Sequence, residues 1–400
     1  MNNLLTKGTS VLKHSIVKYP ILIITVAYLI VSTFLFVSYG IKVVNDTHRY
    51  MEYAENLNQG IYIDQHNIWY VGYVLFLFVI QKISSSHEAI ILAQYALAYV
   101  AVLCLYRTAF MLSNCKLTAV VAALIYCCFM EILTWCSYLI PEGIYISCLT
   151  ITFFLLVKST RLASYIFPTS LFIIFTCLIK PTGIALIGAI LIGVTYKVGL
   201  LIKSRNVKIL VSTSVCLLLL LLANRMLNTF ILIENYVIGE IVYAITSLPN
   251  HPDIELLTLD IPKDIYVPSK DISPLPRLAL FIINNPVFFL KLSLSKVAWF
   301  ILHIRPYWST GHNIFVMLFL MPLYYFSAVF IISEKRSSLK IFTFTFIIIH
   351  IITIAFTTVD WDGRFFMPLM PILIIFGSMG LMNSKENRFS TGNQSLNEKN

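Results

Sequence analysis

Charged residues are scarce in this chain. They make up 12% of its 400 residues, whereas hydrophobic residues make up 58%; soluble globular proteins average about 25% charged and about 45–50% apolar residues. The mean hydropathy is +0.82. Such a chain cannot bury its apolar side chains in a water-soluble core, which excludes a set of soluble domains and leaves lipid as the main solvent.

Glycine is sparse as well, and the glycine-rich patterns that cradle phosphates are missing. The sequence has 15 glycines and neither a Walker nor a dinucleotide-binding arrangement of them. No long polar insert interrupts the apolar segments on the side predicted below to be cytoplasmic. A nucleotide-binding domain is therefore excluded, and with it ATP-driven transport by this chain alone.

Clusters of metal-binding residues are also missing. The eight cysteines all fall in or beside apolar runs, which argues against a disulfide framework and against thiolate zinc sites. The eight histidines show no i, i+3 or i, i+4 pairing, the spacing that brings two ligands to one face of a helix. We predict neither a metal nor another cofactor.

What the chain has in abundance is long apolar runs. Runs of about 20 residues predict membrane-spanning helices, because lipid requires a backbone whose polar groups are satisfied internally. They predict an all-α polytopic membrane protein with about ten spans, forming a single membrane domain over residues 1–400. The predicted spans are 20–39, 88–106, 117–139, 142–158, 162–179, 182–202, 207–226, 312–332, 339–358 and 365–382.

The basic residues predict the orientation of these spans. The net charge is +10, and Lys or Arg occurs in every short loop of one side, as in cytoplasmic loops. This placement favours membrane lipids rather than nucleic acid as the partner. Lys7, Lys13 and Lys18 precede the first span without a small-residue cleavage site, which predicts an uncleaved anchor. Both termini are predicted to be cytoplasmic, including a polar tail over 383–400.

Two apolar stretches, 68–83 and 279–303, would each invert the charge pattern of the later loops if it crossed the membrane alone. We predict that both are helices lying on, or dipping into, the outer membrane surface. The second has Pro286 at its expected first helical position, after two asparagines. A short re-entrant pair is the alternative.

Most of the residues outside the predicted spans then belong to two outer loops, 40–87 and 227–311. Six prolines within 249–276 exclude a regular helix or a central strand there. One acid, Glu131, falls inside the predicted span 117–139, where a carboxylate is expensive to bury. It is either functional, part of a hydrogen bond between helices, or a protonated acid.

The first outer loop carries a candidate catalytic carboxylate. Helical spacing places Asp46, Arg49, Tyr50, Tyr53 and Leu57 on one face of a helix, and Gly60 is the expected stop. A carboxylate beside such an aromatic face can act as a general base toward a hydroxyl. The alternative is that Asp46 only caps the helix. Asp64 and His66 are weaker candidates, which a solvated loop explains equally well.

Four passages of this sequence resemble the GT-C glycosyltransferases, the integral-membrane family that includes the protein mannosyltransferases and the bacterial aminoarabinose transferases. The run from Asp46 to Gly60 resembles the "D-x-x-x-Y-x-x-x-A-x-x-L-x-x-G" loop of that family. The other passages are Tyr138 to Glu142, Asn285 to Lys291 running on to Arg305-Pro306-Tyr307, and Asp360 to Pro371, which resembles an "R-Y-x-x-P-x-x-P" entry to a late span.

The resemblance implies transfer of a sugar from a polyprenyl-phosphate donor to a lipid-linked or polysaccharide acceptor outside the bacterial cytoplasmic (inner) membrane. It implies that Asp46 is catalytic, with Asn45 and Thr47 standing where many members have a second acid, and Phe365 where Tyr follows the arginine. The leaving phosphate needs cations at the outer interface. The residues predicted to bind substrate are Arg49, Tyr50, Lys180, Arg305, Tyr307 and Arg364.

Each predicted cation has a structural alternative. Lys180 can extend its amine to the membrane surface, and Arg364 can pair with Asp360 or Asp362. Two other functions compete with glycosyl transfer. A surface-polysaccharide polymerase would also have many spans and a large outer loop, but would need no first-loop Asp. A flippase or transporter would show internal repeats and charges within the spans, whereas here no repeat is found and the charges cluster at the predicted outer interface.

Overall fold

The computed structural model describes residues 18–61, 66–229, 233–247 and 254–382. Within these ranges the regular secondary structure is helical, and only isolated β-bridges occur besides it. Lys7, Lys13, Asp64 and the tail 383–400, all named above, lie outside the described residues. Packing divides the chain into two compact units, with a division inside one long helix between Phe319 and Leu320.

Seven helices of the described chain are long and apolar enough to cross a membrane, or up to nine segments if two bent helix pairs each count as one span. This confirms a helical membrane protein. Three of the ten predicted spans differ in form. The segment 117–139 is a helix pair bent by 56°, and the segments 162–179 and 365–382 contain the shorter apolar helices Ala163–Cys177 and Met367–Met382. Ten crossings remain a prediction.

The first unit comprises residues up to Lys180, with Leu320–Glu334 and the segment from Met367 onward. Helix α8 is its centre and is the most buried of the long helices, packed against α5 and α9, whereas α2 is largely exposed. The apolar exposed faces, such as that of α2, are what lipid would cover. The helices of this unit are α2 (Pro20–Tyr39), α3 (Asn45–Asn58), α4 (Val71–Gln81), α5 (His87–Ser113), α6 (Lys116–Cys128), α7 (Glu131–Thr134), α8 (Glu142–Ser159) and α9 (Ile166–Cys177).

The break between α6 and α7 changes the environment of Glu131. The sequence placed this acid in the middle of a straight span, but it is the first residue of α7, immediately after the bend. A helix N-terminus favours a carboxylate because the unsatisfied N–H groups there carry partial positive charge. The expectation of a mid-helix acid was therefore wrong.

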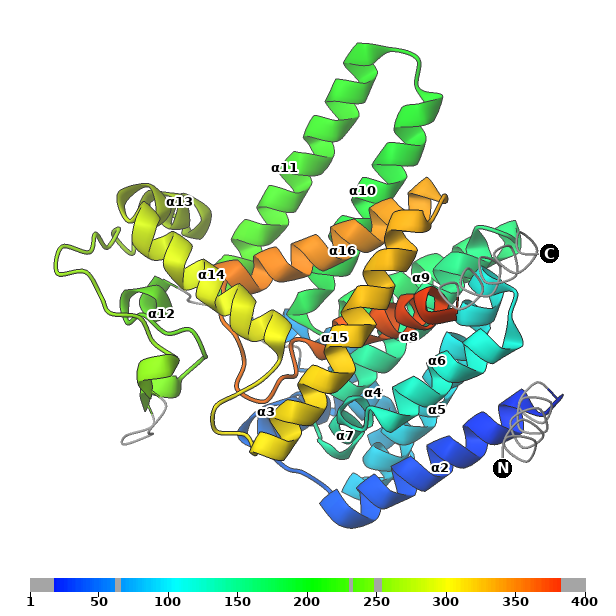
Figure 1. Ribbon diagram of the computed structural model, residues 1–400. Helices are drawn as coiled ribbons and strands as arrows, with labels where there is room; N and C mark the ends of the chain where they lie inside the picture. The colour runs from blue at the N-terminus through cyan, green and yellow to red at the C-terminus, as the bar shows by residue number, and fades with distance from the viewer. Residues whose placement is uncertain (1–17, 62–65, 230–232, 248–253, 383–400) are drawn as a thin grey trace, which may run out of the picture. The chain divides into compact units, whose positions relative to one another are not determined.

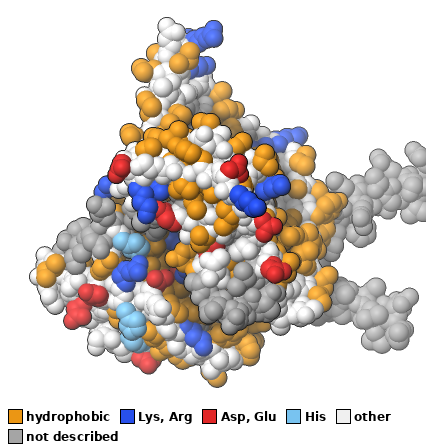
Figure 2. Space-filling model, turned by 90° about the vertical axis from the view of Figure 1, so that its left-hand side faces the viewer, with side chains coloured by type: hydrophobic (Ala, Val, Ile, Leu, Met, Phe, Trp, Pro, Cys, Tyr) orange, Lys and Arg blue, Asp and Glu red, His pale blue; other side chains and the backbone are white. Residues whose placement is uncertain are grey.

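The second unit comprises Pro181–Phe319 and Lys335–Phe366. Its helices are α10 (Ile184–Leu201), α11 (Arg205–Thr229), α12 (Ile233–Val237), α13 (Pro274–Asn284), α14 (Pro286–Leu302), the first part of α15 (Thr310–Ser333) and α16 (Ser337–Phe356). Helices α10 and α11 form an antiparallel pair joined by a short turn (Figure 1), and α16 packs against α10 and α14. Hydrophobic side chains cover wide areas of the face in Figure 2, with charged side chains between them.

The predicted surface helix 279–303 is two helices. Helix α14 begins at Pro286 as expected, but α13 precedes it at an angle of 109°. The corner is Asn285, whose side chain accepts a hydrogen bond from the Tyr266 N–H at 3.0 Å and donates to the carbonyls of Tyr266 and Phe281. These bonds satisfy backbone groups that the corner would otherwise leave without partners. The stretch is therefore a bent pair of helices, the form that the re-entrant alternative would take, with the predicted start at Pro286 confirmed.

The proline-rich stretch behaves as its composition predicts where it is described. Between Leu257 and Ser273 no helix forms, and α13 begins at Pro274. Buried polar groups hold the stretch instead. Arg277 donates to the Pro268 carbonyl at 3.3 Å and pairs with Glu234 at 3.4 Å. Lys296 of α14 is fully buried, donates to the Thr357 carbonyl at 2.6 Å and lies 4.2 Å above the Tyr236 ring.

Candidate functional site

Helix α3 presents the candidate carboxylate just outside the first long apolar helix. The chain leaving α2 is held by Lys42, whose backbone forms two hydrogen bonds across to Ser137 and Leu139. Thr47 Oγ1 then accepts the Val44 N–H at 3.0 Å, which fixes the start of α3, and Gly60, with φ +75°, follows its end as predicted. Asp46 lies inside the first helical turn rather than at the cap position. The capping explanation for Asp46 is therefore wrong.

The Asp46 side chain is open to solvent, with 39% of its surface exposed, and forms an ion pair with Arg49 at 4.0 Å. Arg49 in turn contacts His66 Nε2 at 3.2 Å, and the His66 ring stacks on Tyr70 with centroids 5.0 Å apart. An exposed ion pair of this kind adds little stability. The carboxylate is thus accessible and flanked by hydrogen-bond donors.

Beneath Asp46 lies a cluster of buried tyrosines. Tyr50, one turn further along α3, is 3% exposed, and its ring centroid is 5.0 Å from that of Tyr70 and 5.4 Å from that of Tyr73. Burial raises the pKa of Tyr50 well above its ordinary value, with added contributions from Tyr70, Glu142 and Asp46. Tyr50 therefore remains a neutral phenol and can donate a hydrogen bond but cannot act as a base.

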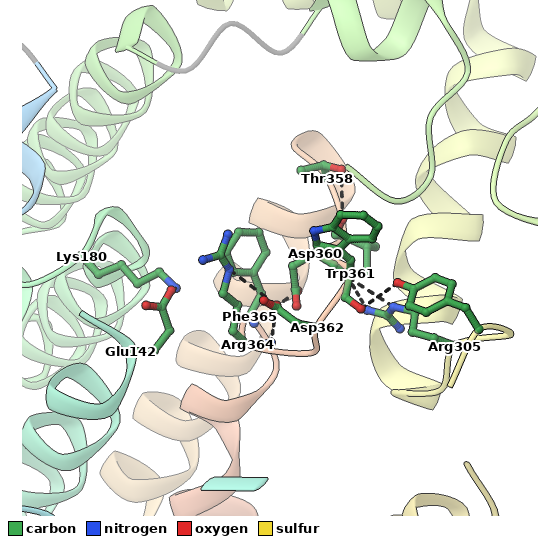
Figure 3. A network of polar contacts seen from close by, with 11 residues as sticks. Glu142, Lys180, Arg305, Thr358, Asp360, Trp361, Asp362, Arg364 and Phe365 are labelled. Atoms are coloured by element: carbon green, nitrogen blue, oxygen red, sulfur yellow. Dashed lines mark hydrogen bonds and ion pairs between the residues drawn. The ribbon is translucent and has the colours of Figure 1, made fainter. Parts of the chain in front are cut away.

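The first unit also contains a buried ion pair between the first residue of α8, Glu142, and Lys180, which follows α9. Lys180 Nζ lies 2.6 Å from Glu142 Oε1, and both side chains are about 5% exposed or less. Figure 3 shows the two side chains pointing toward each other. The negative charge of Glu142 reaches Tyr50, so the pair belongs to the same neighbourhood as the tyrosine cluster. Lys180 is not a membrane-surface lysine, because its charge is buried beside an acid.

In the second unit, Arg305 is the most completely engaged of the predicted cations. It is 1% exposed. Its guanidinium donates two hydrogen bonds to the Asp360 carbonyl and one each to the carbonyls of Trp299 and Ile304. Its backbone N–H and carbonyl also bond the Asn313 side chain. Figure 3 shows this arginine directed at the loop that carries Asp360. These bonds use most of the donors of the guanidinium fork.

The same loop presents the third predicted cation. Arg364 is held by Asp362, with Nε 3.6 Å from Oδ1, and retains 23% of its side chain surface exposed. The predicted alternative of pairing with Asp362 is thus observed. Tyr307 donates its hydroxyl hydrogen to the Trp361 carbonyl at 2.7 Å. The loop is therefore held by Arg305 and Tyr307, and the Arg364 side chain on it stays partly exposed.

Asp360 fixes the loop internally. It is 2% exposed, and its carboxylate accepts the Phe365 N–H at 3.2 Å. Burial alone would raise the pKa of Asp360, but the charges of Arg305, Arg364 and His303 outweigh it, and the pKa lies below its ordinary value. Asp360 is therefore an anion that stabilises the loop and is not a candidate proton donor at neutral pH.

The predicted site residues thus fall into two groups. Asp46, Arg49, Tyr50 and Lys180 lie in the first unit, while Arg305, Tyr307 and Arg364 lie in the second. Sequence reasoning noted Glu142 only as part of a turn and Asp360 only as a possible partner of Arg364. A buried ion pair at Glu142 could have been predicted from its position, because an acid at the very start of an apolar run needs a partner for its charge.

No group of three or more His, Cys, Asp or Glu side chains suited to a metal ion occurs among the residues described. Comparison of the sequence with models of known protein families and with curated proteins gives no match. The arrangement of the residues themselves must therefore carry any functional argument.

Proposed function

We propose that this chain is an integral-membrane glycosyltransferase that moves a sugar from a polyprenyl-phosphate carrier to an acceptor hydroxyl on the outer side of the bacterial cytoplasmic membrane. The observation that supports this most is Asp46. It is an accessible carboxylate in the first turn of an amphipathic helix, directly after an apolar helix of membrane-spanning length. A general base for lipid-linked substrates requires such a place at the interface.

In this transfer one bond to the anomeric carbon forms while another breaks, and Asp46 accepts the proton that is released. The acceptor oxygen forms a bond to the anomeric carbon of the sugar, and Asp46 takes the proton of the acceptor hydroxyl. The bond between that carbon and the phosphate oxygen breaks, and polyprenyl phosphate leaves with the electron pair. The neutral Tyr50 phenol and the Arg49 guanidinium supply donors beside the carboxylate.

The leaving phosphate requires positive charge. Of the cations predicted in the second unit, Arg364 suits this role better than Arg305, because its side chain is 23% exposed and pairs with the exposed acid Asp362. Arg305 is better suited to positioning the loop, since its donors bind carbonyls. Lys180 is likewise better suited to neutralising Glu142 than to binding substrate.

The Asp46→Asn variant tests the proposal. Membranes containing the protein are incubated with a radiolabelled polyprenyl-phosphate hexose, and label is measured in products that survive mild acid, which cleaves the donor. Loss of the base should reduce transfer by about 10²–10⁴-fold without loss of folded protein. Glu52→Gln is the matched control, because Glu52 is an exposed acid on the same helix and should leave transfer unchanged.

Near-normal transfer by Asp46→Asn would overturn the assignment of the base. The same assay separates the proposal from its main rival. A surface-polysaccharide polymerase would consume a polyprenyl-diphosphate oligosaccharide and leave the monophosphate donor untouched.

A further inference from the structure

A pocket lies between α3 and α4, on the same helix that carries Asp46. Its volume is about 50 Å³. All but one of the side chains around it are aliphatic or aromatic. The lining residues are Tyr53, Leu57, Ile61, Asn67, Val71, Val74 and Leu75.

The lining determines what the pocket can hold. A water molecule needs roughly 10–15 Å³ of such volume and two to four polar partners, so the space would admit water but offers it few partners. An apolar chain segment instead gains from removing its surface from water. The pocket therefore fits part of an acyl or prenyl chain better than it fits a sugar.

The lining combines buried and exposed apolar side chains. Val74 is 5% exposed, whereas Leu75 and Ile61 are 41% and 49% exposed. Further along α4, Val79 is 55% exposed. Helix α4 has 11 residues, or about 16 Å of length, which is too short to cross a hydrocarbon layer of about 30 Å. As predicted for the stretch 68–83, we expect α4 to lie at the membrane surface, where a lipid chain can reach the pocket.

The pocket and the candidate base share one face of α3. Asp46, Tyr50, Tyr53 and Leu57 follow one another at i, i+4, i+7 and i+11, so they lie along one side of the helix. Tyr53 is seven residues from Asp46, or about 10 Å along the helix axis. A molecule with a polar head and an apolar chain can therefore reach the carboxylate and the pocket together.

We propose that the acceptor is a membrane lipid whose apolar chain occupies the α3–α4 pocket while its head-group hydroxyl approaches Asp46. This inference rests on the proposed function and names the acceptor class for that site. The exposed Arg49 and His48 beside Asp46 suit an anionic or hydroxyl-rich head group, since both side chains donate hydrogen bonds.

Chain binding is tested without reference to activity. The protein is placed in vesicles of phosphatidylethanolamine and phosphatidylglycerol that contain a phosphatidylglycerol with a photoreactive diazirine at the end of one acyl chain. After illumination, mass spectrometry locates the crosslinked peptides. Crosslinks should fall on residues 53–61 and 67–75 and should decrease about tenfold or more in Val71→Phe, because the larger ring fills the pocket.

Val79→Phe is the matched control, since it adds the same ring to an exposed position of α4 outside the pocket. It should retain the crosslinks, and so should Asp46→Asn. Leu57→Phe is a second filling variant, in case Val71→Phe fails to fold. Crosslinks that persist in both filling variants would overturn the pocket assignment.

The transfer assay then distinguishes the two proposals. The acid-stable labelled product should extract into organic solvent, and the filling variants should form about tenfold less of it while Val79→Phe forms the normal amount. If the filling variants lose crosslinks but keep normal transfer, the pocket holds only bulk lipid and the acceptor assignment is overturned, whereas the proposed function stands. Failure of the unaltered protein to consume the polyprenyl-phosphate donor would overturn the proposed function itself.

Discussion

Charged side chains in this protein occupy two kinds of environment. Arg305, Asp360, Glu142 and Lys180 are almost fully buried and are bonded to opposite charges or to carbonyls. Asp46 and Arg364 keep a substantial part of their surface exposed. Buried charges need fixed partners, because removal from water is costly unless the charge is compensated. The exposed charges are therefore the ones available to substrate.

The contrast between the two loop arginines gives a prediction. Arg305→Ala should lower the free energy of unfolding by about 3 kcal/mol or more, because it leaves several buried carbonyls without donors. Arg364→Ala should change it by less than about 1 kcal/mol but should reduce transfer strongly. Denaturant titration in detergent measures the first effect, and the membrane transfer assay measures the second. Equal stability of the two variants would contradict these roles.

The Glu142–Lys180 pair gives a second prediction at this scale. Glu142→Gln should destabilise the first unit by about 3–5 kcal/mol, because it leaves a buried ammonium without its counter-charge. The double variant Glu142→Leu/Lys180→Met should lose less than the sum of the single variants. Lys270→Met is the control. Its pair with Glu234 is at the surface, where the Lys270 side chain is 81% exposed, so the expected change is about 1 kcal/mol or less. Additive losses would argue against a coupled pair.

At the scale of elements, the sequence predicted most helices and some of their ends. Apolar runs are local, and so are the signals of Pro286 at the start of α14 and Gly60 after α3. The bends were missed because their causes are distant in sequence. The corner at Asn285 depends on Tyr266, 19 residues away, and the loop with Asp360 depends on Arg305, 55 residues away. A single sequence carries no record of such pairings.

The corner between α13 and α14 can be tested with two adjacent asparagines. Asn285→Ala removes three hydrogen bonds that tie the corner to Tyr266 and Phe281, which should cost about 1–3 kcal/mol. Trypsin should then cleave at the exposed Lys263 and Lys270 about fivefold faster or more, if cleavage follows local opening.

Asn284→Ala is the matched control, because the Asn284 side chain is exposed and bonds only the Leu280 carbonyl of its own helix. It should leave the cleavage rate unchanged. Arg277, a third basic residue near this stretch, is buried within α13 and should not be cut in the folded protein. Equal rates for Asn284→Ala and Asn285→Ala would show that the corner does not depend on Asn285.

At the scale of the whole molecule, the open question is how many times the chain crosses the membrane. The α13–α14 pair passes the length and hydropathy test for a span only when its two helices are taken together, and it bends by 109°. Its exposed stripe mixes Val287, Leu290 and Leu294 with Lys291, as a helix at the membrane surface does. We therefore expect the pair to stay on the outer side, with α11 and α15 as the crossings before and after it.

Cysteine labelling decides between a surface pair and a crossing. If the pair does not cross, Lys203 and Lys335 lie on the same side, because α11 and α15 then carry the chain across once each. If it crosses, they lie on opposite sides.

Lys203→Cys and Lys335→Cys place a thiol at exposed positions before α11 and after α15, and Lys270→Cys marks the loop between them. A membrane-impermeant maleimide should label Lys270→Cys in intact cells, and the other two only after permeabilisation, since their loops are basic and expected in the cytoplasm. Labelling of Lys335→Cys in intact cells, with Lys203→Cys protected, would show that the bent pair spans the membrane and would place the C-terminal segments in the opposite orientation.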